Sequence, residues 1–133
     1  MKHHQEARYN MNAYENQKPI VCIDLKKDRI RIHKTTLHMI GDPSFINLLV
    51  NPKEKLIAIK KSSAKDKSAL RIRSNQLDDG NCVEFGCRDL ILLLKDIDNS
   101  WQINSSYRIY GKYNKGECLA QFSIKDSIPT EEI

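Results

Sequence analysis

Three side chains that could contact a polyanion alternate with isoleucines in the segment Arg29-Ile30-Arg31-Ile32-His33. Successive side chains of a β-strand point to opposite faces, so Ile30 and Ile32 are expected to face a core, with the other three side chains facing outward. Side chains on one strand face repeat about every 7 Å, which is comparable to the spacing of successive phosphates on a nucleic-acid strand. The segment therefore predicts a strand whose outer face binds phosphates, with arginine reaching base edges.

Further cations extend this predicted surface. Residues 26–73 hold thirteen basic and four acidic side chains, whereas residues 78–133 hold six basic and ten acidic ones, within a chain of net charge +5. The predicted nucleic-acid-binding residues are Arg29, Arg31, His33, Lys34, Lys60, Lys61, Arg71 and Arg73. Replacing Arg29 and Arg31 together by alanine is predicted to weaken DNA binding at least about tenfold.

Two other interpretations of these charges stay open. A charged edge strand protects a sheet from aggregation, so the alternation would then serve solubility alone. The same basic face could also cover an acidic or nucleic-acid-binding surface of another protein, as in a small inhibitor of the kind phages encode. The acidic second half carries Trp101, Tyr107, Tyr110 and Tyr113 and would serve homodimerisation or a partner.

No arrangement of residues typical of an enzyme accompanies the charges. The chain lacks a glycine-rich phosphate loop, a His-Glu-x-x-His motif and a nucleophile elbow, so we expect neither catalysis nor a cofactor. Cys82 and Cys87 are separated by four residues, which is not the spacing of a paired zinc knuckle, so no metal is expected. The four cysteines are expected to be reduced thiols.

The elements that would position these residues follow from periodicity and turn chemistry. Gly41-Asp42-Pro43 ends a short helix that holds Leu37, Met39 and Ile40 and is capped by Thr35 or Thr36. A buried helix is predicted over Arg88–Ile97. Strands are predicted over residues 20–25, 29–33, 45–50, 56–59, 69–73, 82–85, 107–113 and 119–124, with turns at residues 51–54 and 78–81.

The two halves of the chain share an order of elements. Ile32-x-Lys34-x-x-Leu37 aligns with Phe85-x-Cys87-x-x-Leu90 before each helix, and the turn from Asn51 to Leu56 aligns with that from Asn114 to Leu119. The predicted fold class is therefore α+β, mainly β, with two related β-α-β-β units in one compact domain. We expect a flexible arm over residues 1–18, one domain over 19–125 with units at about 20–61 and 82–125, and a polar tail over 126–133.

This order resembles the AbrB-type swapped-hairpin transcription factors and, used twice, the MraZ arrangement. The resemblance rests on Arg29-Ile30-Arg31-Ile32-His33-Lys34, on Leu37 and Ile40-Gly41, and on residues 45–59 followed by Lys60-Lys61. His33-Lys34 stands where the family usually has proline. The resemblance implies a small regulator of transcription that binds duplex DNA.

Composition excludes several classes of protein. No apolar run approaches the ~20 residues of a membrane span, and no apolar segment follows the polar N-terminus as in a secretory signal. A cytoplasmic location, without membrane contact, is therefore expected.

Overall fold

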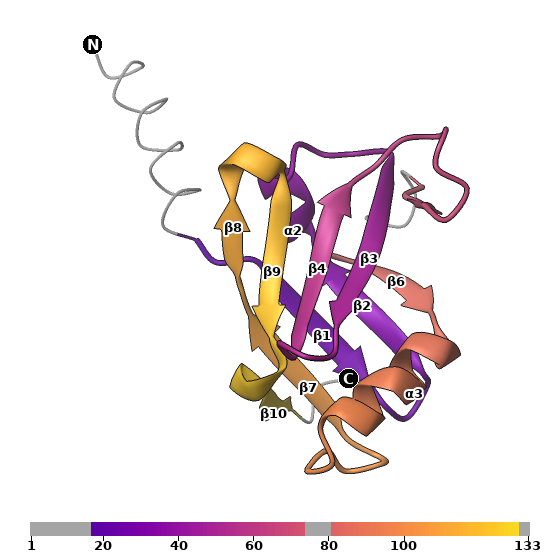
Figure 1. Ribbon diagram of the computed structural model, residues 1–133, viewed down its shortest axis with the longest axis vertical. Coiled ribbons are helices and arrows are strands. Elements are labelled where there is room, and N and C mark those ends of the chain that lie inside the picture. The colour runs from indigo at the N-terminus through magenta and orange to yellow at the C-terminus, as the bar shows by residue number, and fades with distance from the viewer. Residues whose placement is uncertain (1–16, 74–80, 131–133) are drawn as a thin grey trace.

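The computed structural model describes residues 17–73 and 81–130, which form two five-stranded antiparallel sheets and two α-helices (Figure 1). Sheet A has the order β10 (Ile128–Thr130), β7 (Ser106–Tyr110), β1 (Ile20–Asp24), β2 (Arg29–His33) and β6 (Cys82–Gly86). Sheet B has the order β5 (Leu70–Arg71), β3 (Phe45–Asn51), β4 (Leu56–Lys61), β9 (Leu119–Ser123) and β8 (Lys112–Asn114). The predicted α+β, mainly β class is confirmed.

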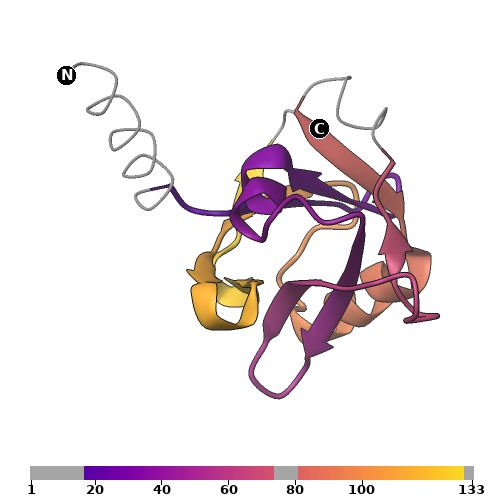
Figure 2. The ribbon, with the colours of Figure 1, turned by 90° about the horizontal axis from the view of Figure 1, so that it is seen from above.

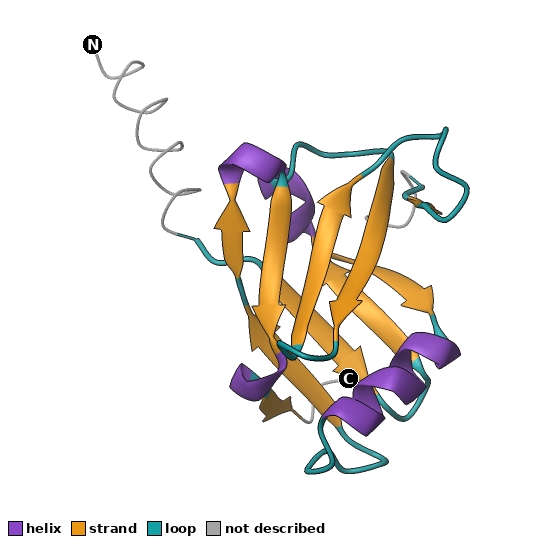
Figure 3. Cartoon of the chain, in the orientation of Figure 1, coloured by secondary structure: helices purple, strands orange, loops and turns teal. Residues whose placement is uncertain are grey.

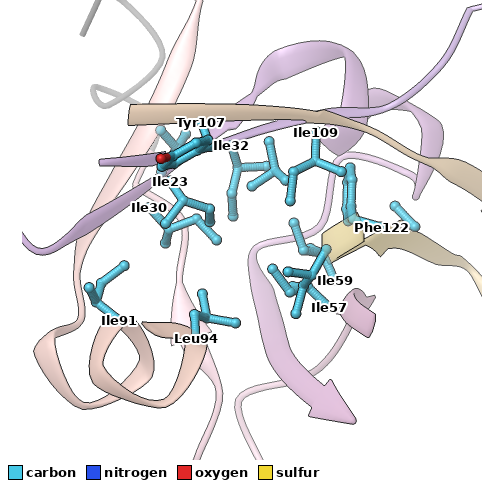
Figure 4. Packing of buried hydrophobic residues seen from close by; sticks show 14 of the residues in the cluster. Ile23, Ile30, Ile32, Ile57, Ile59, Ile91, Leu94, Tyr107, Ile109 and Phe122 are labelled. Carbon is cyan, nitrogen blue, oxygen red and sulfur yellow. The ribbon is translucent and has the colours of Figure 1, made fainter. Parts of the chain in front are cut away.

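The two sheets pack face to face and share one core. In Figure 1, sheet B lies in front of sheet A, and the helix α3 (Arg88–Ile97) lies at the lower right, beside the ends of both sheets. Figure 4 shows Ile57, Ile59 and Phe122 of sheet B facing isoleucines of sheet A, with Ile91 and Leu94 of α3 to the left of Ile57 and Ile59. All these side chains are fully buried. Because the inner faces are occupied by the core, any binding role falls to the outer faces.

The strands predicted over residues 20–25 and 29–33 are present as β1 and β2, which form an antiparallel hairpin. Val21 pairs with Ile32 and Ile23 with Ile30, and all four side chains are fully buried. β2 also pairs along its whole length with β6, so it is an interior strand of sheet A. The hairpin therefore does not stand free as a two-stranded ribbon.

The short helix α2 (Lys34–Met39) begins at a different cap from the one predicted. His33 is the N-cap, and its Nδ1 accepts a hydrogen bond from the Thr35 amide at 3.1 Å. Thr36 is instead buried against β1, where its hydroxyl accepts from the Ile20 amide and donates to the Ile20 carbonyl. Tertiary packing therefore overrides the local capping preference of threonine.

The single strand predicted over residues 107–113 is divided between the two sheets. β7 ends at Tyr110 in sheet A, and β8 begins at Lys112 in sheet B. A Cβ atom at Gly111 would lie 2.3 Å from the Gln121 carbonyl oxygen and 2.6 Å from a ring carbon of Phe122. Only glycine permits this close approach, at the point where the chain passes from one sheet to the other.

Other predicted elements differ in extent or burial. α3 has the predicted bounds (Figure 3). Leu92 and Leu93 on its other face are exposed. The strand predicted over residues 69–73 shortens to β5, and Ile128–Thr130 of the predicted polar tail pairs with β7. The predicted arm falls mostly, and the turn at 78–81 almost wholly, outside the described residues, as do residues 131–133. No described helix has the length and hydropathy needed to cross a bilayer.

The strand registers place corresponding residues of the two halves opposite each other. The alignment of the halves makes Arg31 correspond to Glu84 and Ala58 to Gln121, and these residues are directly paired in β2–β6 and β4–β9. Where the halves meet in sheet A, a cation of the basic half therefore faces a carboxylate of the acidic half.

Candidate nucleic-acid interface

The outer face of sheet A holds the three side chains of the predicted strand surface. Arg29, Arg31 and His33 are half-buried and alternate with fully buried isoleucines. Arg108 of β7 lies on the same face, because Cys22 pairs with both Arg31 and Arg108. Three guanidinium groups therefore gather on this face, which we call the arginine face.

The carboxylate of Asp24 neutralises part of the positive charge on the arginine face. This fully buried carboxylate accepts hydrogen bonds from Arg29 Nε at 2.8 Å, the Lys26 amide at 3.0 Å and Ser106 Oγ at 3.3 Å. Burial by itself would raise the pKa of Asp24, but the hydrogen bonds from Arg29, Lys26 and Lys27 outweigh it and hold the pKa below its usual value. Asp24 is thus a charged structural anchor for Arg29.

Glu84 of β6 contacts both arginines of β2. Arg29 Nη1 donates to Glu84 Oε2 at 2.7 Å, and Arg31 Nε lies 3.1 Å from Glu84 Oε1. The Arg31 contact has the distance of an ion pair but not the alignment of a hydrogen bond, so Arg31 Nε has no hydrogen-bond partner among the described residues. One carboxylate therefore balances two arginines, and the side chains of Arg29 and Arg31 are only 18% and 22% exposed.

His33 and Lys34 stand at the end of the arginine face where α2 begins. Burial and the nearby charges of Lys34, Arg108 and His38 lower the pKa of His33. The neutral ring is also the form that can accept the Thr35 amide hydrogen. His33 is therefore a capping residue here, whereas Lys34 is exposed to solvent.

The other predicted cations belong to sheet B. Lys60 lies on the outer face of β4, opposite Asn47 and Leu119, and Arg71 of β5 lies opposite Phe45. Lys61 falls on the other side of β4, at the exposed strand end. Together with Arg73 and the exposed loop lysines 65 and 67, these residues form the basic surface, namely Lys60, Lys61, Lys65, Lys67, Arg71 and Arg73.

Asp66 is the one acidic residue between Lys60 and Arg73, and its carboxylate accepts hydrogen bonds within the loop between β4 and β5. Asp66 Oδ1 accepts from the Ser68 amide at 2.9 Å and from Ser68 Oγ at 2.7 Å, and its Oδ2 accepts from Ser62 Oγ at 3.3 Å. These hydrogen bonds lower the pKa of Asp66. Among the described residues, no carboxylate forms an ion pair with Arg71 or with any lysine of the basic surface.

The outward strand positions of sheet B hold no carboxylate, although Glu117, in the turn between β8 and β9, accepts a hydrogen bond from Asn114 Nδ2 at 3.1 Å. One row of paired residues across four strands reads Asn47, Lys60, Leu119 and Asn114. The next row reads Leu49, Ala58, Gln121 and Lys112. The remaining outward positions of these strands are Phe45, Asn51, Leu56, Arg71 and Ser123. Every one of these strand residues is described, and none is acidic.

The structure places five of the eight predicted residues on two separate outer faces, whereas Lys34 begins α2, Lys61 lies on the other side of β4 and Arg73 follows β5. Arg29, Arg31 and His33 come together on sheet A, and Lys60 and Arg71 lie on sheet B. Sequence reasoning missed Asp24 and Glu84 as partners of the arginines, and it missed Lys112 as a cation of sheet B. Asp24 sits within an apolar run, which is a signal that could have indicated a buried, paired carboxylate.

No group of three or more metal-ligating side chains gathers within residues 17–73 and 81–130. Burial raises the pKa of the Cys82 and Cys87 thiols, which favours their neutral form. The charged and polar side chains on the outer faces of both sheets can form ion pairs and hydrogen bonds.

Compared with protein-family models, with curated proteins and with solved structures, the chain matches none of them.

Proposed function

We propose that this protein is a small nucleic-acid-binding regulatory protein and that the basic surface of sheet B is its phosphate-contacting site. The observation that carries the proposal is the contrast in pairing. Lys60, Lys65, Lys67 and Arg71 have no ion-pair partner among the described residues, whereas Arg29 and Arg31 share carboxylates. A cation without a protein partner can replace the counterions of a phosphate at little cost, because no ion pair has to break first.

The supporting geometry is the placement of these cations along one edge of the molecule. The loop between β4 and β5 projects at the upper right of Figure 3, next to the end of β4 that carries Lys60 and Lys61. Asp66 holds this loop in shape through Ser62 and Ser68. The basic surface thus presents its charges on a pre-formed scaffold, which lowers the entropic cost of binding.

The experiment is a fluorescence-anisotropy titration with labelled DNA across a range of salt. The test variant is Lys60→Ala/Arg71→Ala. The control is Arg88→Ala/Lys125→Ala, which removes two exposed charges from α3 and from the segment after β9. The test variant is expected to bind about tenfold or more weakly. It is also expected to reduce the salt slope by about two, because each phosphate that a cation neutralises adds about one to that slope.

Equal losses in both double variants would show that only net charge matters and would overturn the site. The alternative of a protein–protein module, which would use the same basic surface, predicts no DNA binding even at low salt. It also predicts a protein partner that remains bound to the wild type after nuclease treatment and no longer binds Lys60→Ala/Arg71→Ala.

A further inference from the structure

The outer face of sheet B is broader than a strand pair that reads duplex DNA. Figure 1 shows its strands side by side in the front layer of the molecule, and Figure 2 shows this layer from above. Four strands about 4.8 Å apart span about 14 Å between the outermost axes, before side chains are added. The major groove of B-DNA is about 12 Å wide and admits a helix or a two-stranded ribbon. This face therefore cannot enter the groove.

The side chains on this face nevertheless suit nucleobases as well as phosphates. Phe45 is paired with Arg71, so an aromatic residue and an arginine occupy neighbouring strand positions on the same face. Leu49 is 47% exposed, and Gln121 lies one strand beyond Ala58 in the same row, followed by Lys112. Gln121 is exposed and its side chain makes no hydrogen bond to the described residues. Because this face does not enter the groove, its amide, ring and apolar surface would not reach the base edges of a closed duplex.

We infer that the outer face of sheet B takes single-stranded nucleic acid, with a base stacked on Phe45, phosphates on Arg71, Lys60 and Lys112, and a base edge on Gln121. This inference rests on the proposed function and narrows it to one class of ligand. Bases of a single strand are free to lie flat on a sheet, and base–aromatic stacking is tolerant of sequence. The absence of carboxylates from the strand positions of this described face removes the repulsion that would otherwise oppose a phosphate chain.

The test is anisotropy titration of the full chain with three labelled probes of about 12 units, a length within the site sizes of β-domains that bind single strands. The probes are oligo-dT, oligo-U and a mixed-sequence duplex. Both single strands are expected to bind at least about tenfold more tightly than the duplex. A difference between oligo-dT and oligo-U identifies which sugar the face prefers.

Phe45→Leu removes the aromatic face while keeping apolar volume, and Phe45→Tyr keeps the ring. Phe45→Leu is expected to weaken single-strand binding about fivefold or more, the lower end of what base stacking contributes, with duplex binding unchanged. Phe45→Tyr is expected to retain binding. Circular dichroism and the melting temperature of each variant establish that it is folded.

The outcomes separate this inference from the proposed function. Duplex binding as tight as single-strand binding, with weaker binding in Lys60→Ala/Arg71→Ala, overturns the single-strand inference and leaves the basic surface as the site. Single-strand binding that Phe45→Leu does not change overturns the stacking position. Failure of all three probes to bind at low salt overturns both proposals.

Discussion

The outer faces of the two sheets carry equal numbers of strand cations and differ in where carboxylates stand. Sheet A presents Arg29, Arg31 and Arg108, and sheet B presents Lys60, Arg71 and Lys112. On sheet A, Asp24 and Glu84 lie among the arginines. On sheet B, the outward strand positions hold no carboxylate.

The number of cations on a sheet face therefore does not by itself locate a binding site for a polyanion. An arginine that already donates to a buried carboxylate must give up or share that hydrogen bond before it can bind phosphate, and breaking such a pair is costly. Glu84 comes from the acidic second half, so the neutralisation of Arg29 and Arg31 depends on the pairing of β2 with β6. Among the described strand residues of the basic half, the cations without an ion-pair partner therefore lie on sheet B.

The largest expected effect comes from removing the carboxylate anchor of the arginine face. Asp24→Ala should lower the free energy of unfolding by about 3 kcal/mol, because it leaves Arg29 without its buried partner. Urea denaturation followed by circular dichroism measures the change. Asp126→Ala, which removes an exposed carboxylate, should change stability by less than about 0.5 kcal/mol. Similar losses in both variants would show that Asp24 is not an anchor.

The next effect compares the two faces directly. Arg29→Ala/Arg31→Ala should lower the free energy of unfolding by about 1–3 kcal/mol, since Asp24 loses a charged donor. It should weaken nucleic-acid binding by less than about threefold, because the removed charges are already balanced by carboxylates. Anisotropy beside Lys60→Ala/Arg71→Ala checks this. A tenfold loss of affinity, as the sequence alone predicts, would return the site to the arginine face.

A smaller effect is expected when the neutralising carboxylate itself is removed. Glu84→Gln leaves Arg29 and Arg31 with one negative charge fewer, and the 44% exposed Glu84 side chain limits the loss of stability to less than about 1 kcal/mol. Nucleic-acid affinity at low salt should rise more than in the matched variant Asp126→Asn. Equal rises in the two variants would mean that the arginine face stays closed to phosphate even when unpaired.

The smallest effect concerns pH and His33. Its pKa is lowered by folding, so the unfolded state takes up a proton first as pH falls below about 6.5. The stability that neutral His33 provides is therefore present above that pH and lost below it. His33→Asn keeps a capping acceptor without titrating, so its stability should fall less than that of the wild type between about pH 7 and pH 5. Parallel pH profiles of the two proteins would exclude His33 as the source.

Local patterns in the sequence predicted much of the fold, because they report periodicity and turn chemistry. The alternation around Ile30 and Ile32, the bounds of α3 and the end of α2 at Gly41 are all local properties, and they are confirmed. The division of residues 107–113 at Gly111 depends instead on the approach of Phe122, which no local pattern contains.

The sequence predicted which types of residue form the candidate site, but not which of those residues lie together on one sheet face. Which sheet face holds Lys60 and which holds Arg31 is decided by pairings between distant strands, such as β2 with β6. The neutralisation of Arg29 by Asp24 likewise requires knowing that Asp24 is buried on the outer side of β1. Neither fact follows from spacing along the chain.

The mixing of both halves in each sheet also has a consequence for the order of events during synthesis. Val21 of β1 pairs with Ile109, and Ile57 of β4 pairs with Phe122, so neither sheet can be completed before residues 106–123 have been synthesised. Arg29 and Arg31 meet Glu84 only after β6 has emerged. Such distant pairings give a high contact order, for which folding is slow. We therefore expect Arg29 and Arg31 of the nascent basic half to lack their Glu84 partner until β6 has paired with β2.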